Sequence, residues 1–157
     1  KNRVSVRFWK NKDIKKNVLE DILRISLSSP ISCNRQSIRF LVKKNKNPVK
    51  MGDSNNISMV EKAPITLYVI GDSRFYSEKY ANALDCGGVC STILLLAKAH
   101  GILGCWIYGC ESLPQRKMKK KYKLKSGEYI YSVITLGYPY DAQEKPPRVF
   151  INKVKYI

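Results

Sequence analysis

One run of residues constrains the fold of this chain more than any other, residues 63–70 with the sequence APITLYVI. The run is almost continuously apolar and has the length of a strand, which is typical of a strand covered on both faces. We therefore expect it at the centre of a sheet. The chain has 157 residues and 44% apolar composition, enough to bury one core but not two, so a single domain over 1–157 is predicted.

Helical and strand spacings flank this run on both sides. Residues 13–27 carry apolar side chains at spacings of four, four and three, which predicts an amphipathic helix with Asp13 as its N-cap. Gly101 is the residue type that best tolerates a left-handed helix end, so it should close a long, mostly buried helix. The expected elements are a helix at 13–27, strands at 37–42 and 63–70, a helix at 76–100, a strand at 103–108, a basic helix at 111–122 and a strand at 129–136. Such interleaving indicates an α+β or α/β layer fold.

The last segment, 149–157, is a candidate fifth strand because its apolar residues alternate, although imperfectly. It follows Pro146 and Pro147, which direct the chain away from its own body. An edge strand of a second subunit offers unpaired backbone groups to such a segment. We therefore formulate the hypothesis that this strand is exchanged with a partner subunit.

Composition argues against several classes of protein. The chain has no run of about 18 apolar residues, so no membrane span is predicted. No apolar signal-peptide core precedes the first element, which favours a cytoplasmic location. The five cysteines include no C-x-x-C pair and there is one histidine, so we expect reduced thiols and no metal site.

The formal net charge of +17 would attract polyanions such as nucleic acid, nucleotide phosphates or an anionic membrane surface. Lysines outnumber arginines and spread along the whole chain, and no recognisable nucleic-acid motif accompanies them. Solvated surface lysine is the favoured interpretation, so no specific nucleic-acid partner and no membrane partner are expected. A basic polyanion-binding protein without a cofactor remains an alternative.

The first candidate site residues lie at the N-terminus, in the sequence Arg-Val-Ser-Val-Arg. Side chains two residues apart in an extended segment point the same way, so Arg3, Ser5 and Arg7 should line one face. Two guanidiniums and a hydroxyl suit a phosphate and a polyol. An exposed basic N-terminus is the alternative for this segment taken alone.

Two further features add to this candidate site. Asn34 and Gln36 lie in a loop where side-chain amides can meet the edge of a planar heterocycle, although ordinary turn formation is an alternative. Gly87 and Gly88 lie inside the long predicted helix, where glycine costs stability. They indicate close approach by a neighbouring helix at a dimer seam or by a bound ring.

Taken in order, these features resemble the nitroreductase family. That family opens with R-R-S-x-R and continues with a helix, P-S-x-x-N-x-Q, a strand after Ala-Pro, a D-x-G helix, a G-L-G-x-x-W-like strand and a G-Y-P-x…K-x-x-R ending. The matching positions are Arg3, Ser5, Arg7, Ser32, Asn34, Gln36, Ala63, Pro64, Asp85, Gly104, Trp106, Gly109, Gly137, Tyr138, Pro139, Lys145 and Arg148. The resemblance covers almost the whole chain.

The resemblance implies an α+β protein with a central, mainly antiparallel sheet flanked by helices. It also implies a homodimer through the long central helices, with FMN held at the interface and touched by both chains. Members take hydride from NADH or NADPH onto the flavin and then reduce a small acceptor such as a nitroaromatic or a quinone. No catalytic side chain is expected, because the flavin carries the hydride.

The same resemblance implies roles for single residues. Arg3 and Arg148 would contact the phosphate with help from Lys145, while Ser5 and Arg7 would reach the ribityl chain or the pyrimidine edge. The remaining cofactor-binding residues that it implies are Ser32, Asn34, Gln36, Tyr108 and Gly109. Asn34 would come from the other subunit.

Departures from the family pattern keep the activity open. Val4 replaces the usual second arginine, Ser37 and Ile38 replace a frequent Pro-Trp, and the segment 43–62 is shorter than usual. In relatives this last region shapes the substrate pocket. A non-catalytic or specialised flavin-binding member of the same fold is therefore an alternative to a working reductase.

Overall fold

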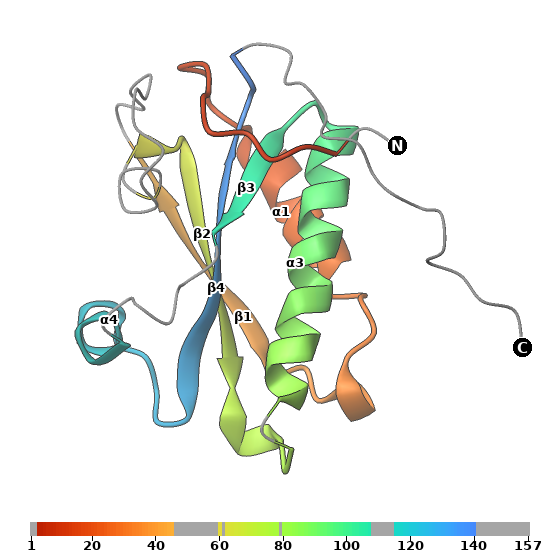
Figure 1. Cartoon of the computed structure of the whole chain (residues 1–157), viewed down its shortest axis with the longest axis vertical. Coiled ribbons are helices and arrows are strands. Elements are labelled where there is room, and N and C mark those ends of the chain that lie inside the picture. Colours follow the sequence, from red (N-terminus) through yellow and green to blue (C-terminus); the bar gives the residue numbers. More distant parts are fainter. Residues whose placement is uncertain (1–2, 46–59, 61, 79, 108–114, 141–157) are drawn as a thin grey trace, which may run out of the picture.

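The computed structural model describes residues 3–45, 60, 62–78, 80–107 and 115–140. These described residues form a four-stranded sheet in the order β1-β2-β4-β3 (Figure 1). The strands are β1 (Ile38–Lys44), β2 (Ile65–Asp72), β3 (Leu103–Ile107) and β4 (Glu128–Gly137). All three neighbouring pairs are antiparallel, so the predicted α+β class is confirmed and the α/β alternative is wrong.

Strand β2 is the expected centre of the sheet. It pairs with β1 on one side and β4 on the other, and all eight of its residues are buried. Leu67 and Val69 point into a core with α1 (Lys16–Ser26) and α3 (Ala81–Ala99), while Tyr68 and Ile70 point into a second core. The continuous apolar run is therefore explained by burial on both faces.

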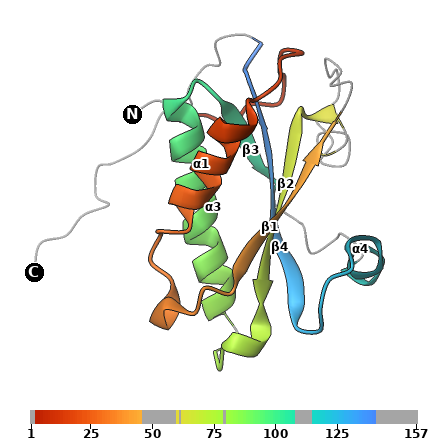
Figure 2. The same ribbon diagram turned by 180° about the vertical axis from the view of Figure 1, so that it is seen from behind.

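Helices cover the two faces unequally. Helices α1 and α3 lie side by side on one face, as Figures 1 and 2 show from opposite sides. The short helix α4 (Gln115–Tyr122) lies on the other, where Met118 and Tyr122 pack against the second core. Within the described chain, no helix is long and apolar enough to cross a membrane.

Two predicted helix starts are wrong. Helix α1 begins at Lys16, and Asp13 does not cap it because its carboxylate accepts a 2.8 Å hydrogen bond from Lys44 Nζ at the end of β1. Helix α3 begins at Ala81 instead of near residue 76, because a short 3-10 turn, η2 (Ser73–Phe75), comes first and Tyr76 is extended. Both differences come from contacts made by residues outside the helices themselves.

The end of α3 follows the prediction. Gly101 has a φ of +70°, and Ile102 N–H donates a 3.0 Å hydrogen bond back to the Ala97 carbonyl. This is the left-handed closure that glycine permits at low cost. The predicted strand at 103–108 and the helix at 111–122 are found in their described parts, whereas the candidate strand at 149–157 lies outside the described residues.

Candidate functional site

The N-terminal segment is anchored along the edge strand β3. Val6 N–H donates to the Gly104 carbonyl at 3.2 Å, and the neighbouring Ser5 forms a parallel bridge with Gly104. Val6 is fully buried, and Trp9 is buried with its indole N–H donating to the Leu103 carbonyl at 3.2 Å. An anchored segment can present side chains in fixed positions, which a free basic terminus could not.

Gly104 makes this anchoring possible. A Cβ atom at this position would lie 2.0 Å from the Thr135 carbonyl oxygen and 2.8 Å from Leu136 Cδ2. The obstacle at Thr135 is backbone of β4, so it cannot move aside without disturbing the sheet. Glycine at 104 therefore lets β3 pair closely with β4 while it holds the N-terminal segment.

A hollow of about 440 Å³ lies between this segment, α3 and β3. Its lining combines polar groups from the N-terminal segment with apolar groups from α3 and an aromatic ring from β3. The lining residues are Arg3, Ser5, Ser91, Leu94, Leu95 and Trp106. Trp106 is fixed, because its indole N–H donates a 3.1 Å hydrogen bond to Ser132 Oγ. The hollow thus offers a cation and a hydroxyl next to an apolar, partly aromatic wall.

The arginines of the N-terminal segment have no acidic partner among the residues that the structure describes. Neither Arg3 nor Arg7 forms an ion pair with another described residue, and Arg3 contacts only the Ser5 hydroxyl, at 3.5 Å. Burial raises the pKa of the Cys105 thiol, and the charge of Arg7, a hydrogen bond with Ser5 and the charge of Arg3 oppose that rise. Both positive charges therefore act on the same point of β3, although Arg7 itself is exposed and does not line the hollow.

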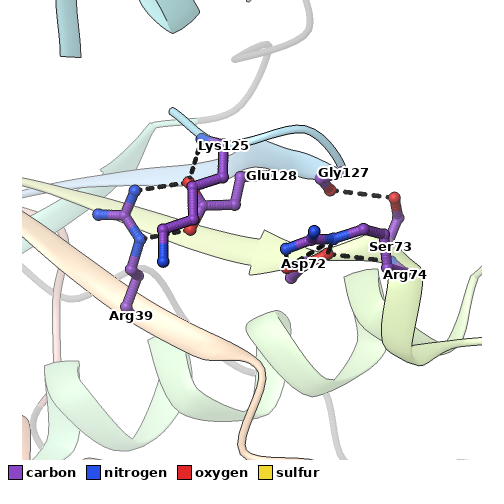
Figure 3. A network of polar contacts seen from close by, with 7 residues as sticks. All are labelled: Arg39, Asp72, Ser73, Arg74, Lys125, Gly127 and Glu128. Carbon is purple, nitrogen blue, oxygen red and sulfur yellow. Dashed lines mark hydrogen bonds and ion pairs between the residues drawn. The ribbon is translucent and has the colours of Figure 1, made fainter. Parts of the chain in front are cut away.

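Arginines at the opposite end of the sheet are paired instead (Figure 3). Arg39 donates two hydrogen bonds of 2.7 Å to the buried Glu128, and Arg74 donates to the buried Asp72 from its Nε at 2.9 Å. The hydrogen bonds from Arg39 lower the pKa of Glu128, and those from Arg74 lower the pKa of Asp72. We call these two pairs the charge clamp. It ties β1, β2 and β4 together.

The predicted loop with the amide side chains is a strained turn. A 3-10 turn, η1 (Ser32–Asn34), carries φ values of 51° at both Cys33 and Asn34, and Gln36 has a φ of 49°. We call the whole segment 32–37 the η1 turn. Residues other than glycine rarely adopt such values, which cost free energy and cluster at functional sites. The side chains of Asn34 and Gln36 are exposed, so they are displayed to the surroundings.

The structure does not bring the two halves of the predicted site together within one chain. The η1 turn is fixed to Asp85 in the first turns of α3, where the Ser32 N–H donates a 3.0 Å hydrogen bond. The hollow is lined by Leu94, nine residues further along, or about 14 Å at the rise of an α-helix. Figure 1 shows the N-terminal segment near one end of α3 and the η1 turn near the other.

Part of the lining was not predicted from the sequence. Ser91, Leu94 and Leu95 were not among the predicted site residues, and Trp106 was noted only as a match to a family motif. The two glycines inside α3 were the sequence signal that pointed to this part of the helix. A Cβ atom at Gly87 would lie at an ordinary 3.6 Å from Trp106, and one at Gly88 would have no neighbour within 4 Å. Whatever these glycines accommodate is thus not a close neighbour in the described chain.

Four predicted site residues lie outside the described residues. They are Tyr108, Gly109, Lys145 and Arg148. Of the others, Arg3 and Ser5 line one hollow, Arg7 lies beside it, and Ser32, Asn34 and Gln36 belong to the turn at the other end of α3.

The fold defines a layered α+β protein with a cationic hollow at the edge of an antiparallel sheet. Residues 1–156 match the family model described as "Putative TM nitroreductase", and the chain belongs to this nitroreductase family. A similar protein from Archaeoglobus fulgidus, named "Putative NADH dehydrogenase/NAD(P)H nitroreductase", is 25% identical over 147 residues, which cover 90% of this chain and 84% of the relative.

Solved structures share the fold. A protein of that same name from Bacteroides thetaiotaomicron aligns with a TM-score of 0.81 and 25% identity, covering 99% of this chain and 92% of the other. A protein from Desulfovibrio desulfuricans, described as "a putative nitroreductase in complex with fmn", aligns with a TM-score of 0.81 and 17% identity, covering 99% of this chain and 94% of the other. At that identity the second likeness concerns the fold alone.

Proposed function

We propose that this chain is an FMN-dependent oxidoreductase that passes hydride from NADH or NADPH to a small acceptor such as a nitroaromatic or a quinone. The observation that carries the proposal is the hollow, where Arg3 has no ion-pair partner among the described residues and faces an apolar wall with Trp106 and Leu94. A phosphate on a polyol chain with a planar ring needs this combination of groups. The FMN complex of the Desulfovibrio relative and the names of the other relatives support the cofactor and the electron donor.

The residues present fit FMN in the following roles. The guanidinium of Arg3 would bind the phosphate, together with Arg148 and Lys145, because its planar fork matches phosphate oxygens. Ser5 would bind the ribityl chain, and Arg7 would contribute positive charge near the pyrimidine edge. Leu94, Leu95 and Trp106 would keep water away from the ring. The bound flavin supplies the hydride chemistry, so no side chain needs to act as a general acid or base.

We further propose that the site is completed in a homodimer. Helix α3 exposes a stripe of apolar and small residues along one face. Leu84 is 73% exposed and Leu95 is 60% exposed, and Gly88 lies between them. Large apolar side chains at such exposure mark an interaction surface when they line up along one helix face. Two copies packed with antiparallel α3 helices would bring Asn34 and Gln36 of one chain toward the hollow of the other.

The proposed activity is tested with the purified protein. We expect the visible absorption band of oxidised flavin, which bleaches when NADH or NADPH is added without oxygen and returns when a quinone or nitroaromatic is added. Protein that takes up FMN but is not reduced by either nucleotide would contradict the reductase and leave a flavin-binding module. Protein that takes up no FMN would contradict both.

The proposed dimer is tested by sedimentation of Leu84→Arg and Leu95→Arg at micromolar concentration. We expect a dimer for the unchanged chain and a monomer for each variant, because a buried unpaired charge opposes association. Leu27→Arg is the matched control, since Leu27 is an exposed leucine at the C-cap of α1 and does not belong to the α3 stripe. A monomeric unchanged chain would contradict the composite site.

A further inference from the structure

The η1 turn is held by a cluster of buried and half-buried polar groups. Asp85 Oδ2 accepts two hydrogen bonds, from Ser32 N–H at 3.0 Å and from the Tyr76 hydroxyl at 2.9 Å. Tyr76 Oη lies 2.7 Å from Ser37 Oγ. Because the one phenol proton goes to Asp85, Ser37 donates to the phenol oxygen. Asp85 and Tyr76 thus grip the turn at both of its ends.

Arg35 adds a third contact to the same cluster. Its guanidinium lies 5.1 Å from the centre of the Tyr76 ring and donates a 3.0 Å hydrogen bond to the Ser32 carbonyl. Arg35 is half-buried, while its neighbours Asn34 and Gln36 are exposed. Arg35 therefore helps to hold the turn in place, whereas Asn34 and Gln36 are exposed to the surroundings.

Left-handed backbone at three positions must be offset by contacts of this kind. Residues other than glycine rarely adopt this conformation and it costs free energy, so a turn with three of them would relax if nothing held it. Burial raises the pKa of Tyr76 to about 12, so the phenol keeps its proton and remains a donor at neutral pH. The hydrogen bonds that oppose relaxation are therefore present under ordinary conditions.

We propose that Tyr76 and Asp85 are positioning residues that lock the η1 turn in its left-handed form, so that Asn34 and Gln36 are ready to bind the flavin of a second copy. This inference rests on the proposed function. Asp85 lies next to Leu84 of the exposed α3 stripe, so the turn is attached to the same helix that would dock two copies. The position of the amides is thereby linked to the position of the dimer seam.

The test compares Tyr76→Phe with Tyr131→Phe. Both changes remove one half-buried phenol hydroxyl near the start of α3, but the Tyr131 hydroxyl contacts Asn82 at 3.4 Å and none of the η1 turn. Backbone amide exchange is first measured across residues 31–37 in protein freed of FMN. We expect exchange about tenfold faster in Tyr76→Phe and unchanged in Tyr131→Phe, as the loss of one hydrogen bond predicts.

FMN affinity is measured next on the same proteins. We expect the dissociation constant to rise about tenfold in Tyr76→Phe and to stay within twofold in Tyr131→Phe, with equal melting temperatures for the two variants. Asp85→Asn, which keeps one acceptor oxygen, should show a smaller change of the same sign in both measurements. A purely structural role would lower the melting temperature without affecting the flavin.

Each remaining outcome is decisive. Unchanged exchange across the turn in Tyr76→Phe would overturn the proposal, and so would faster exchange with unchanged FMN affinity. If the unchanged chain takes up no FMN, the proposed function and the role of the turn in flavin binding both fail. Amide exchange across the turn then still shows whether Tyr76 holds it. Failure of the proposed function is thereby distinguished from failure of the role assigned to Tyr76.

Discussion

Arginines at the two ends of the sheet have opposite surroundings. At the charge clamp, Arg39 and Arg74 each neutralise a buried carboxylate, and backbone groups of Ser73 and Gly127 join the two pairs into one network (Figure 3). At the hollow, Arg3 has only a weak contact with Ser5 and no acid among the described residues. Arginine thus stabilises the fold at one end of the sheet and is available to bind a ligand at the other.

Surroundings of this kind determine which positive charges of a strongly basic chain can bind an anion. A guanidinium paired with a carboxylate has its charge compensated and part of its five donors engaged, whereas one beside a hydroxyl and an apolar wall keeps its charge and most of its donors available. Net charge alone does not make that distinction, because it counts all arginines equally. Substitutions at the charge clamp should therefore change stability, and substitutions at the hollow should change FMN binding.

The largest effect is expected from Gly104→Ala. A Cβ atom there would lie 2.0 Å from backbone of β4, so β3 must shift, at a cost of about 3 kcal/mol of unfolding free energy. The N-terminal segment should detach with it and FMN binding should be lost. Chemical denaturation and FMN titration check both effects, and a variant of normal stability that still binds FMN would contradict the anchoring.

Gly127→Ala is the counterpart at the clamp. Its φ is +82°, and a Cβ atom would lie 2.5 Å from Arg74 Cγ, a flexible side chain that can move. We expect a loss of about 1–2 kcal/mol in the same denaturation experiment, with unchanged FMN affinity. A larger loss of unfolding free energy in Gly127→Ala than in Gly104→Ala would contradict the prediction that the substitution at the hollow has the larger effect.

Arg39→Ala should destabilise the protein without affecting FMN. It removes the ion-pair partner of the buried Glu128, to which the Lys125 N–H still donates, and since the Arg39 side chain is 39% exposed we expect a loss of about 2 kcal/mol, less than for a fully buried pair. Arg24→Ala is the control, because it removes an exposed pair with Asp21 and should cost less than about 0.5 kcal/mol. Equal effects of the two substitutions would contradict a structural role for the clamp.

Acid should weaken the charge clamp. The pKa values of Asp72 and Glu128 lie below their ordinary 3.8 and 4.5, so the pairs contribute stability above that range and lose it as the pH falls through the lowered values. Unfolding free energy should therefore be level from about pH 7 to 5 and fall below about pH 4. In Arg39→Ala the fall should be shallower, and an unchanged slope would contradict the account.

Much of the fold was predictable because its signals are local or periodic. The buried strand β2 follows from a continuous apolar run, and the end of α3 follows from Gly101. The starts of α1 and α3 were not predictable in the same way. Asp13 pairs with Lys44 of β1, and the Tyr76 hydroxyl donates to Asp85. Contacts with other parts of the chain therefore decided where the two helices begin, and the local spacing of apolar residues did not.

The positions of the candidate site residues follow from the sequence only in part. The two-residue spacing grouped Arg3, Ser5 and Arg7, of which Arg3 and Ser5 line the hollow and Arg7 does not. Leu94 and Leu95 were not predicted as site residues, because apolar residues of a helix are normally expected in the core. In the structure Leu95 is exposed. The separation between the hollow and Asn34 depends on the length and direction of α3, which no motif records.

The measurement that tests the central claim most directly compares the affinities of FMN and riboflavin, which differ by the phosphate alone. We expect the unchanged chain to prefer FMN, Arg3→Ala to reduce that preference about tenfold or more through its FMN affinity, and riboflavin binding to change little. Arg24→Ala removes the same charge elsewhere and should leave the preference intact. An undiminished preference for FMN in Arg3→Ala would contradict the assignment of the unpaired arginine to the phosphate.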